Sequence, residues 1–103
     1  MQKSSKKGLP IAECIADYDC YARDVRGLST STREIHCRVL RGFCSFRLGD
    51  TQIDWSAVRF TDFVSFLTAE FERLPNRDTQ RVLLTTVRVI LRYLSDMGAI
   101  PKG

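Results

Sequence analysis

The sequence lacks any uninterrupted run of about 18 apolar residues, the minimum for a membrane-spanning helix. Its basic start, residues 1–8, is not followed by the apolar stretch of a secretory signal, because Glu13 interrupts the run that begins at Ile11. These absences predict a cytoplasmic protein with no membrane partner.

The sequence is also poor in catalytic and metal-binding residues. His36 is the one histidine, and the cysteines, spaced by six and seven within each pair, do not form a CxxC motif. His36 stands beside Cys37, but no second close pair completes a zinc site. We therefore expect free thiols at Cys14, Cys20, Cys37 and Cys44. We also expect no metal, no cofactor and no catalytic residues in the chain.

With 103 residues, the chain has room for one domain around one core. Sixteen Lys and Arg residues against 12 Asp and Glu residues make a formal net charge of +4. This charge suits a polyanionic partner, although solubility alone also explains it. We expect a flexible basic tail over residues 1–8 and a folded domain over residues 9–101.

Apolar residues recur at three- and four-residue steps in four segments, which predicts an all-α fold of four helices. The first helix runs from Pro10 to Gly27. The second begins at the hydroxyl-rich stretch 29–32 and stops at Gly49–Asp50. A connector over residues 51–59 precedes the third, which Thr61 caps and Pro75 ends. The fourth and longest covers about 78–97, before Gly98 and Pro101.

The same periodicity predicts which side chains form the core. The first helix and the second contribute Ile11, Cys14, Ile15, Tyr18, Ala22, Val25, Ile35, Val39, Leu40, Phe43 and Phe46. The connector and the last two helices contribute Ile53, Trp55, Phe63, Val64, Leu67, Phe71, Leu83, Leu84, Val87, Ile90, Leu91 and Leu94.

Positive charge is concentrated on two of these helices. At 100° per residue, four arginines of the fourth helix fall within about 60° of arc: Arg77, Arg81, Arg88 and Arg92. On the second helix, Arg38 and Arg41 share a face and Arg33 lies in the first turn. Residues 9–28 instead carry four acids and two bases. The basic face indicates nucleic-acid binding, whereas a solvated helix face is the simpler alternative.

Both basic helices also begin with polar turns, which contain Thr32 in one case and Thr79 and Gln80 in the other. Free N–H groups and the positive end of the dipole make a helix N-terminus a ready phosphate site. Simple helix capping explains the same residues, and the two roles can coexist.

Several stretches resemble the core-binding domain of the tyrosine recombinase (phage integrase) family. Residues 27–32, Gly-Leu-Ser-Thr-Ser-Thr, and 40–43, Leu-Arg-Gly-Phe, resemble its "Gly-Leu-Ser-x-x-Thr … Leu-Arg-x-Phe" start. Residues 53–55 and 60–67 resemble the entry to its third helix, and 79–94 its closing helix. The ending at 98–101 is similar to the passage into the linker of these domains. The resemblance covers residues 9–101.

The resemblance implies a four-helix SAM-like domain that forms half of a clamp around duplex DNA near the recombination site. Its second and fourth helices face the DNA, which by position implicates Thr32, Arg33, Arg38, Arg41, Arg77, Thr79, Gln80, Arg81, Arg88 and Arg92. An Arg side chain can form two hydrogen bonds with guanine, and a Gln side chain can do the same with adenine. Most contacts of such domains nevertheless go to phosphates. Expected partners are duplex DNA, the catalytic domain of the same parent protein and a recombinase oligomer on DNA.

The family's catalytic domain has no counterpart in this sequence, so we expect no strand-transfer activity from this chain. Tyr18, Tyr21 and Tyr93 lack the basic residues that surround the family's nucleophilic tyrosine. The main alternative is a helical protein–protein interaction module, in which the acidic first helix or the aromatic-rich third helix docks a partner. RNA binding is less favoured because few aromatic residues interleave with the basic ones, and a small enzyme is less favoured still.

Overall fold

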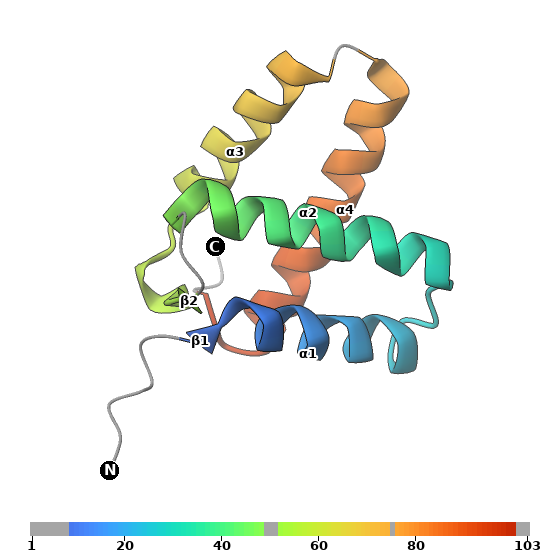
Figure 1. Cartoon of the computed structure of the whole chain (residues 1–103), viewed down its shortest axis with the longest axis vertical. Coiled ribbons are helices and arrows are strands. Elements are labelled where there is room, and N and C mark those ends of the chain that lie inside the picture. The colour runs from blue at the N-terminus through green and yellow to red at the C-terminus, as the bar shows by residue number, and fades with distance from the viewer. Residues whose placement is uncertain (1–8, 49–51, 75, 101–103) are drawn as a thin grey trace.

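The computed structural model describes residues 9–48, 52–74 and 76–100. Four helices dominate it: α1 (Ile11–Asp24), α2 (Thr30–Leu48), α3 (Phe60–Arg73) and α4 (Arg77–Asp96). The predicted all-α fold of four helices is confirmed. In Figure 1, α1 and α2 lie side by side, α4 crosses α2, and α3 begins beside the C-terminal end of α2. Helix α2 therefore packs on all three other helices.

A short β pair was not predicted from the sequence. Residues Leu9–Pro10 (β1) pair antiparallel with Gln52–Ile53 (β2), and the 3-10 turn η2 (Trp55–Ala57) follows. Each strand has only two residues, so neither shows the alternation by which a strand is recognised. The pair joins the start of α1 to the connector, whose Ile53 and Trp55 are buried as expected.

The helix ends follow the predicted signals in most places. Gly27 and Gly98 adopt left-handed φ values of 65° and 74° after α1 and α4, as expected of residues that end helices. Helix α3, however, begins at Phe60, so the prediction that Thr61 caps it is wrong. The Asp62 carboxylate instead accepts a hydrogen bond from the Arg59 backbone N–H at 2.8 Å.

The predicted core is correct at most positions, but four residues are exposed: Val25, Ile35, Phe46 and Val64. Helix α1 ends at Asp24, which leaves Val25 outside it. The buried stripe of α2 is rotated from the predicted one, so that His36 and Cys44 are buried in place of Ile35 and Phe46. The rotation arises because α2 packs on helices to either side. Val64 lies on the side of α3 that faces away from α2.

The expected basic tail (residues 1–8), the stop at Gly49–Asp50, and Pro75 and Pro101 lie outside the described residues. Within the described ranges, none of the helices has both the length and the apolar character needed to cross a membrane.

Candidate nucleic-acid interface

The α4 arginines form one exposed row. Arg77, Arg81, Arg88 and Arg92 are all exposed and lie opposite the buried stripe of this helix. The row is about 22 Å long at 1.5 Å per residue. None of its guanidinium groups forms an ion pair with another residue that the structure describes. The row is therefore available to an anionic partner.

The arginines of α2 lie on a different side of the molecule. Arg38 and Arg41 are exposed, whereas His36, Leu40 and Phe43 are buried on the opposite side of this helix. Helices α2 and α4 pack on each other through their buried sides, so their outward sides point in opposite directions. The structure thus separates the two arginine faces, which the sequence could not place relative to each other.

A groove of about 380 Å³ joins α2 to the start of α4. Arg38 lines it from α2 and Thr79 from α4, so the structure brings together these two predicted residues. Its apolar walls are Ile35, Val39, Gly42, Phe66, Leu74, Val82 and Leu83. At the edge of the groove, Arg73 donates to Glu70 at 2.6 Å, which neutralises that guanidinium.

Arg33 has a structural partner inside the fold. Its Nε lies 3.0 Å from the Asp19 carboxylate, and its side chain is only 16% exposed. This ion pair joins α1 to α2 and lies in the groove between them, which Arg41 also lines. The structure therefore places Arg33 apart from the exposed arginines.

Gln80 is also engaged within the fold. Its side-chain amide nitrogen donates to the backbone oxygens of Leu74 at 2.6 Å and Phe71 at 3.3 Å. The last carbonyls of a helix have no partner within that helix, so Gln80 completes the end of α3 from the first turn of α4. No local pattern in the sequence signals this contact, because it depends on how the two helices meet.

The polar turns at the starts of α2 and α4 act as helix caps. Asn76 Oδ1 accepts from the backbone N–H groups of Asp78 at 2.8 Å and Thr79 at 3.2 Å. Ser29 Oγ accepts from the Thr32 N–H at 3.3 Å, and its hydroxyl donates to the Thr32 hydroxyl at 3.0 Å. These contacts confirm the capping interpretation and occupy backbone donors that a phosphate requires.

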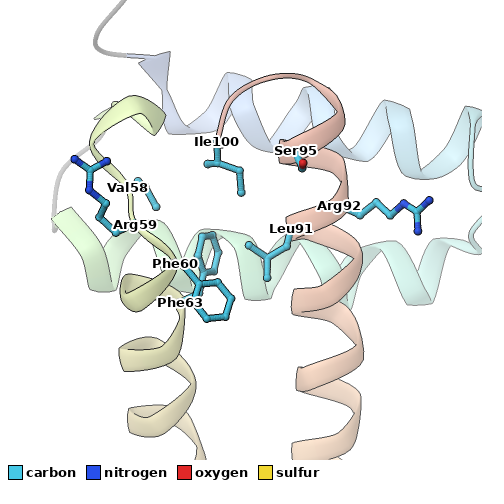
Figure 2. Close-up of a pocket in the computed structure, with 8 residues that line it drawn as sticks. All are labelled: Val58, Arg59, Phe60, Phe63, Leu91, Arg92, Ser95 and Ile100. Carbon is cyan, nitrogen blue, oxygen red and sulfur yellow. The ribbon is translucent and has the colours of Figure 1, made fainter. Parts of the chain in front are cut away.

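An apolar pocket of about 410 Å³ opens between the start of α3 and the end of α4. Phe60, Phe63, Leu91 and Ile100 point into it from both helices and from the segment after α4, as Figure 2 shows. Arg92 lines the edge, but its guanidinium points away from the pocket. Phe60 is 70% exposed, so this side of the molecule presents apolar surface beside the α4 arginines.

A buried Tyr–His pair was missed at the sequence level. The Tyr18 hydroxyl lies 2.6 Å from His36 Nδ1, and both side chains are buried. Burial raises the pKa of Tyr18 and, together with the charge of Arg26, lowers the pKa of His36. Both groups are thus neutral at pH 7 and enclosed in the core, so their geometry indicates a structural pair.

The four cysteines do not gather into a site. All four are free thiols, and burial raises the pKa of Cys14, Cys37 and Cys44. Across the ranges 9–48, 52–74 and 76–100, no three His, Cys, Asp or Glu side chains lie close enough together to hold a metal ion.

The chain is similar to a protein from Sinorhizobium fredii named "Putative integrase/recombinase y4rA". The two are 31% identical over 90 residues, which make up 87% of this chain and 22% of the relative. The chain therefore spans about a fifth of the length of the curated relative it matches. No family model matches the chain, and no solved structure matches it. The similarity supports a relation to integrases and recombinases.

Proposed function

We propose that residues 9–101 form the DNA-binding, SAM-like core-binding domain of a site-specific tyrosine recombinase. The similarity to an integrase/recombinase over 87% of the chain supports this function, as does the four-helix fold. Cleavage and strand transfer belong, in this proposal, to the catalytic domain of a longer protein. That domain and duplex DNA are then the partners of this chain.

The groove between α2 and the start of α4 carries the proposal. Arg38 and Thr79 line it together, and Arg41 lies on the same outward side of α2 as Arg38. Two helices that meet at one exposed groove suit a duplex better than one isolated helix does, because several phosphates along a curved backbone can be contacted at once. Arg77 and Arg81 lie in the first turns of α4, which is the end of that helix from which Thr79 lines the groove.

The remaining predicted residues have other roles in this proposal. Arg33, Gln80 and Thr32 hold the fold through an ion pair, a helix end and a cap. Arg88 and Arg92 share the exposed row of α4 with Arg77 and Arg81, but they lie farther along the helix, away from the groove. We therefore exclude these five from the proposed DNA contact.

Two double variants with the same loss of charge test this assignment. R38A/R41A removes arginines of the proposed interface, whereas R88A/R92A removes two exposed arginines of α4 that lie away from the groove. Fluorescence anisotropy with a labelled duplex, at several salt concentrations, measures affinity and its salt dependence. Each lost phosphate contact lowers the slope of log affinity against log salt by about 0.9, so we expect R38A/R41A to lower it by about 1.8 and R88A/R92A to leave it close to the parent value.

Other outcomes contradict the proposal at different levels. Equal losses in the two variants would indicate attraction by net charge alone. A larger loss in R88A/R92A would move the interface to the outer side of α4. A parent protein that binds no duplex even at about 20 mM salt, where screening is weak, would exclude DNA binding by this domain.

A further inference from the structure

The groove between α2 and the start of α4 has exposed aliphatic side chains on both of these helices. Ile35 on α2 is 36% exposed and Val82 on α4 is 48% exposed, and both line the groove. Val39, one turn after Ile35, is half-buried and lines it as well. Contact between water and aliphatic surface is unfavourable, so a partner that covers these side chains with an apolar group gains free energy.

Polar side chains stand beside the aliphatic ones on each of the two helices. On α2, Arg38 is exposed next to Val39, and on α4, Thr79 is exposed one turn before Val82. A ligand seated in the groove therefore meets a positive charge and a hydroxyl group together with aliphatic carbon. This combination suits a ligand that has an anionic backbone and also carries apolar groups.

The acid that lines this groove does not oppose an anionic ligand. Glu70 lines the groove from α3, and its carboxylate already accepts a hydrogen bond from Arg73 at 2.6 Å. Arg73 lines the groove as well, so this pair adds no net negative charge. Arg38 forms no ion pair within the part of the chain that the structure describes. The groove therefore keeps a net positive charge beside its aliphatic walls.

Duplex DNA presents a matching pattern. Its backbone phosphates are anionic, and each thymine places an apolar 5-methyl group in the major groove, where aliphatic side chains recognise it by contact. We infer that Ile35, Val39 and Val82 contact thymine methyl groups in the major groove, so that the domain prefers duplexes with C5-methyl groups. This inference rests on the DNA binding proposed above and adds the feature of the bases that the groove reads.

Pairs of duplexes that differ only in C5-methyl groups test the contact. One pair is alternating dA-dT against alternating dA-dU, and the other is alternating dG-dC against its 5-methylcytosine form. Each duplex has about 20 base pairs, or two turns of B-DNA, so the backbone charge is equal within each pair. Fluorescence anisotropy at about 20 mM salt, where screening is weak, measures the affinity of the parent protein for all four duplexes.

We expect the methylated member of each pair to bind at least about threefold more tightly, since burying one methyl group corresponds to about fourfold in affinity. The effect should appear in both pairs, because the 5-methyl group of methylcytosine also lies in the major groove. This comparison needs only the parent protein, so it does not depend on whether any variant folds.

Two double variants with the same loss of aliphatic surface assign the effect to the groove. I35S/V82S removes exposed aliphatic side chains of the groove, whereas V25S/V64S removes exposed aliphatic side chains elsewhere and is the matched control. The methyl preference should fall below about twofold in I35S/V82S and stay at the parent value in V25S/V64S. Neither variant loses a charge, so the salt dependence should not change, in contrast to R38A/R41A. Circular dichroism verifies that both variants are folded.

Three results would overturn the inference, and they are distinguishable. Equal affinity for methylated and unmethylated duplexes would leave the DNA binding intact and the aliphatic walls to a protein partner, such as an amphipathic helix. An undiminished methyl preference in folded I35S/V82S would assign the preference to DNA shape. A parent protein that binds none of the four duplexes would contradict the proposed function itself.

Discussion

The core of this domain has two halves of different chemistry, and α2 contributes to both. Beside α1, Tyr18 packs on the buried His36, and Tyr18, Tyr21 and Tyr93 pack on one another, with ring centroids 4.8–6.0 Å apart. Toward α3, Phe43 is stacked on Phe63 at 4.0 Å and meets Phe66 edge-on at 5.6 Å. The first half buries hydroxyl and imidazole groups, whereas the second is purely hydrophobic.

This difference separates two ways of stabilising one small core. An apolar cluster is stabilised by burial and close packing, and it is insensitive to pH. A buried polar pair adds stability only while its hydrogen bond is made, because an unpaired polar group costs free energy in the interior. The stability contributed by the half around His36 should therefore depend on single atoms and on pH. The stability contributed by the half around Phe43 should depend on the side-chain volume that fills it.

Phe43→Ala should have the largest effect, because it opens a cavity among three other aromatic rings. A buried Phe→Ala change costs about 3–5 kcal/mol of the free energy of unfolding, which denaturant titration measures. Phe46→Ala on the same helix is the matched control. Its ring is 48% exposed, so it should cost less than about 1.5 kcal/mol. Equal losses in the two variants would contradict the assignment of the core.

Tyr18→Phe should have an intermediate effect, because it removes one oxygen and leaves His36 Nδ1 buried without a partner. Such a change costs about 1–3 kcal/mol. Tyr93→Phe is the control, since no hydrogen bond of the Tyr93 hydroxyl is found among the described residues. If Tyr93→Phe destabilised the protein as much as Tyr18→Phe, the special role of the Tyr18–His36 bond would be wrong.

The smallest effect is a pH dependence that belongs to the His36 half alone. The pKa of His36 is lowered by burial and by Arg26 from its ordinary value of 6.5, so the folded state binds fewer protons than the unfolded state near that pH. Stability is then complete above pH 6.5 and falls as the pH decreases toward the folded pKa. Thermal unfolding between pH 5 and 8 measures this slope. The slope should vanish in Y18F/H36F, and its persistence there would assign it to other groups.

The existence and order of the helices could be predicted because their signals are local. Periodic apolar residues, Ser29 as a cap and Gly27 and Gly98 as stops each act within a few residues. The errors arose where packing partners decide burial. His36 is buried and Phe46 exposed because α2 contacts helices on two sides, and no local pattern reveals that rotation. The two-residue β pair was missed because it is not local either: β1 precedes α1 and β2 follows α2, so the packing of these two helices brings the strands together.

The candidate site divides in a similar way. That Arg77, Arg81, Arg88 and Arg92 share one side of a helix follows from residue spacing alone. Sequence spacing, however, carries no information on how two helices are oriented relative to each other. Arg33 and Gln80 looked available for DNA but are engaged by Asp19 and by the end of α3, which are partners that only the packing of helices brings near.

The amino-acid pattern is thus sufficient for four helices, their order and the charge carried by each face, because backbone periodicity determines these properties within a single helix. Tertiary packing decided that the arginines of α2 and α4 point in opposite directions, that Arg38 and Thr79 share a groove, and that Tyr18 meets His36. Each of these depends on the crossing of helices distant in sequence, and many side chains across the whole core together determine that crossing.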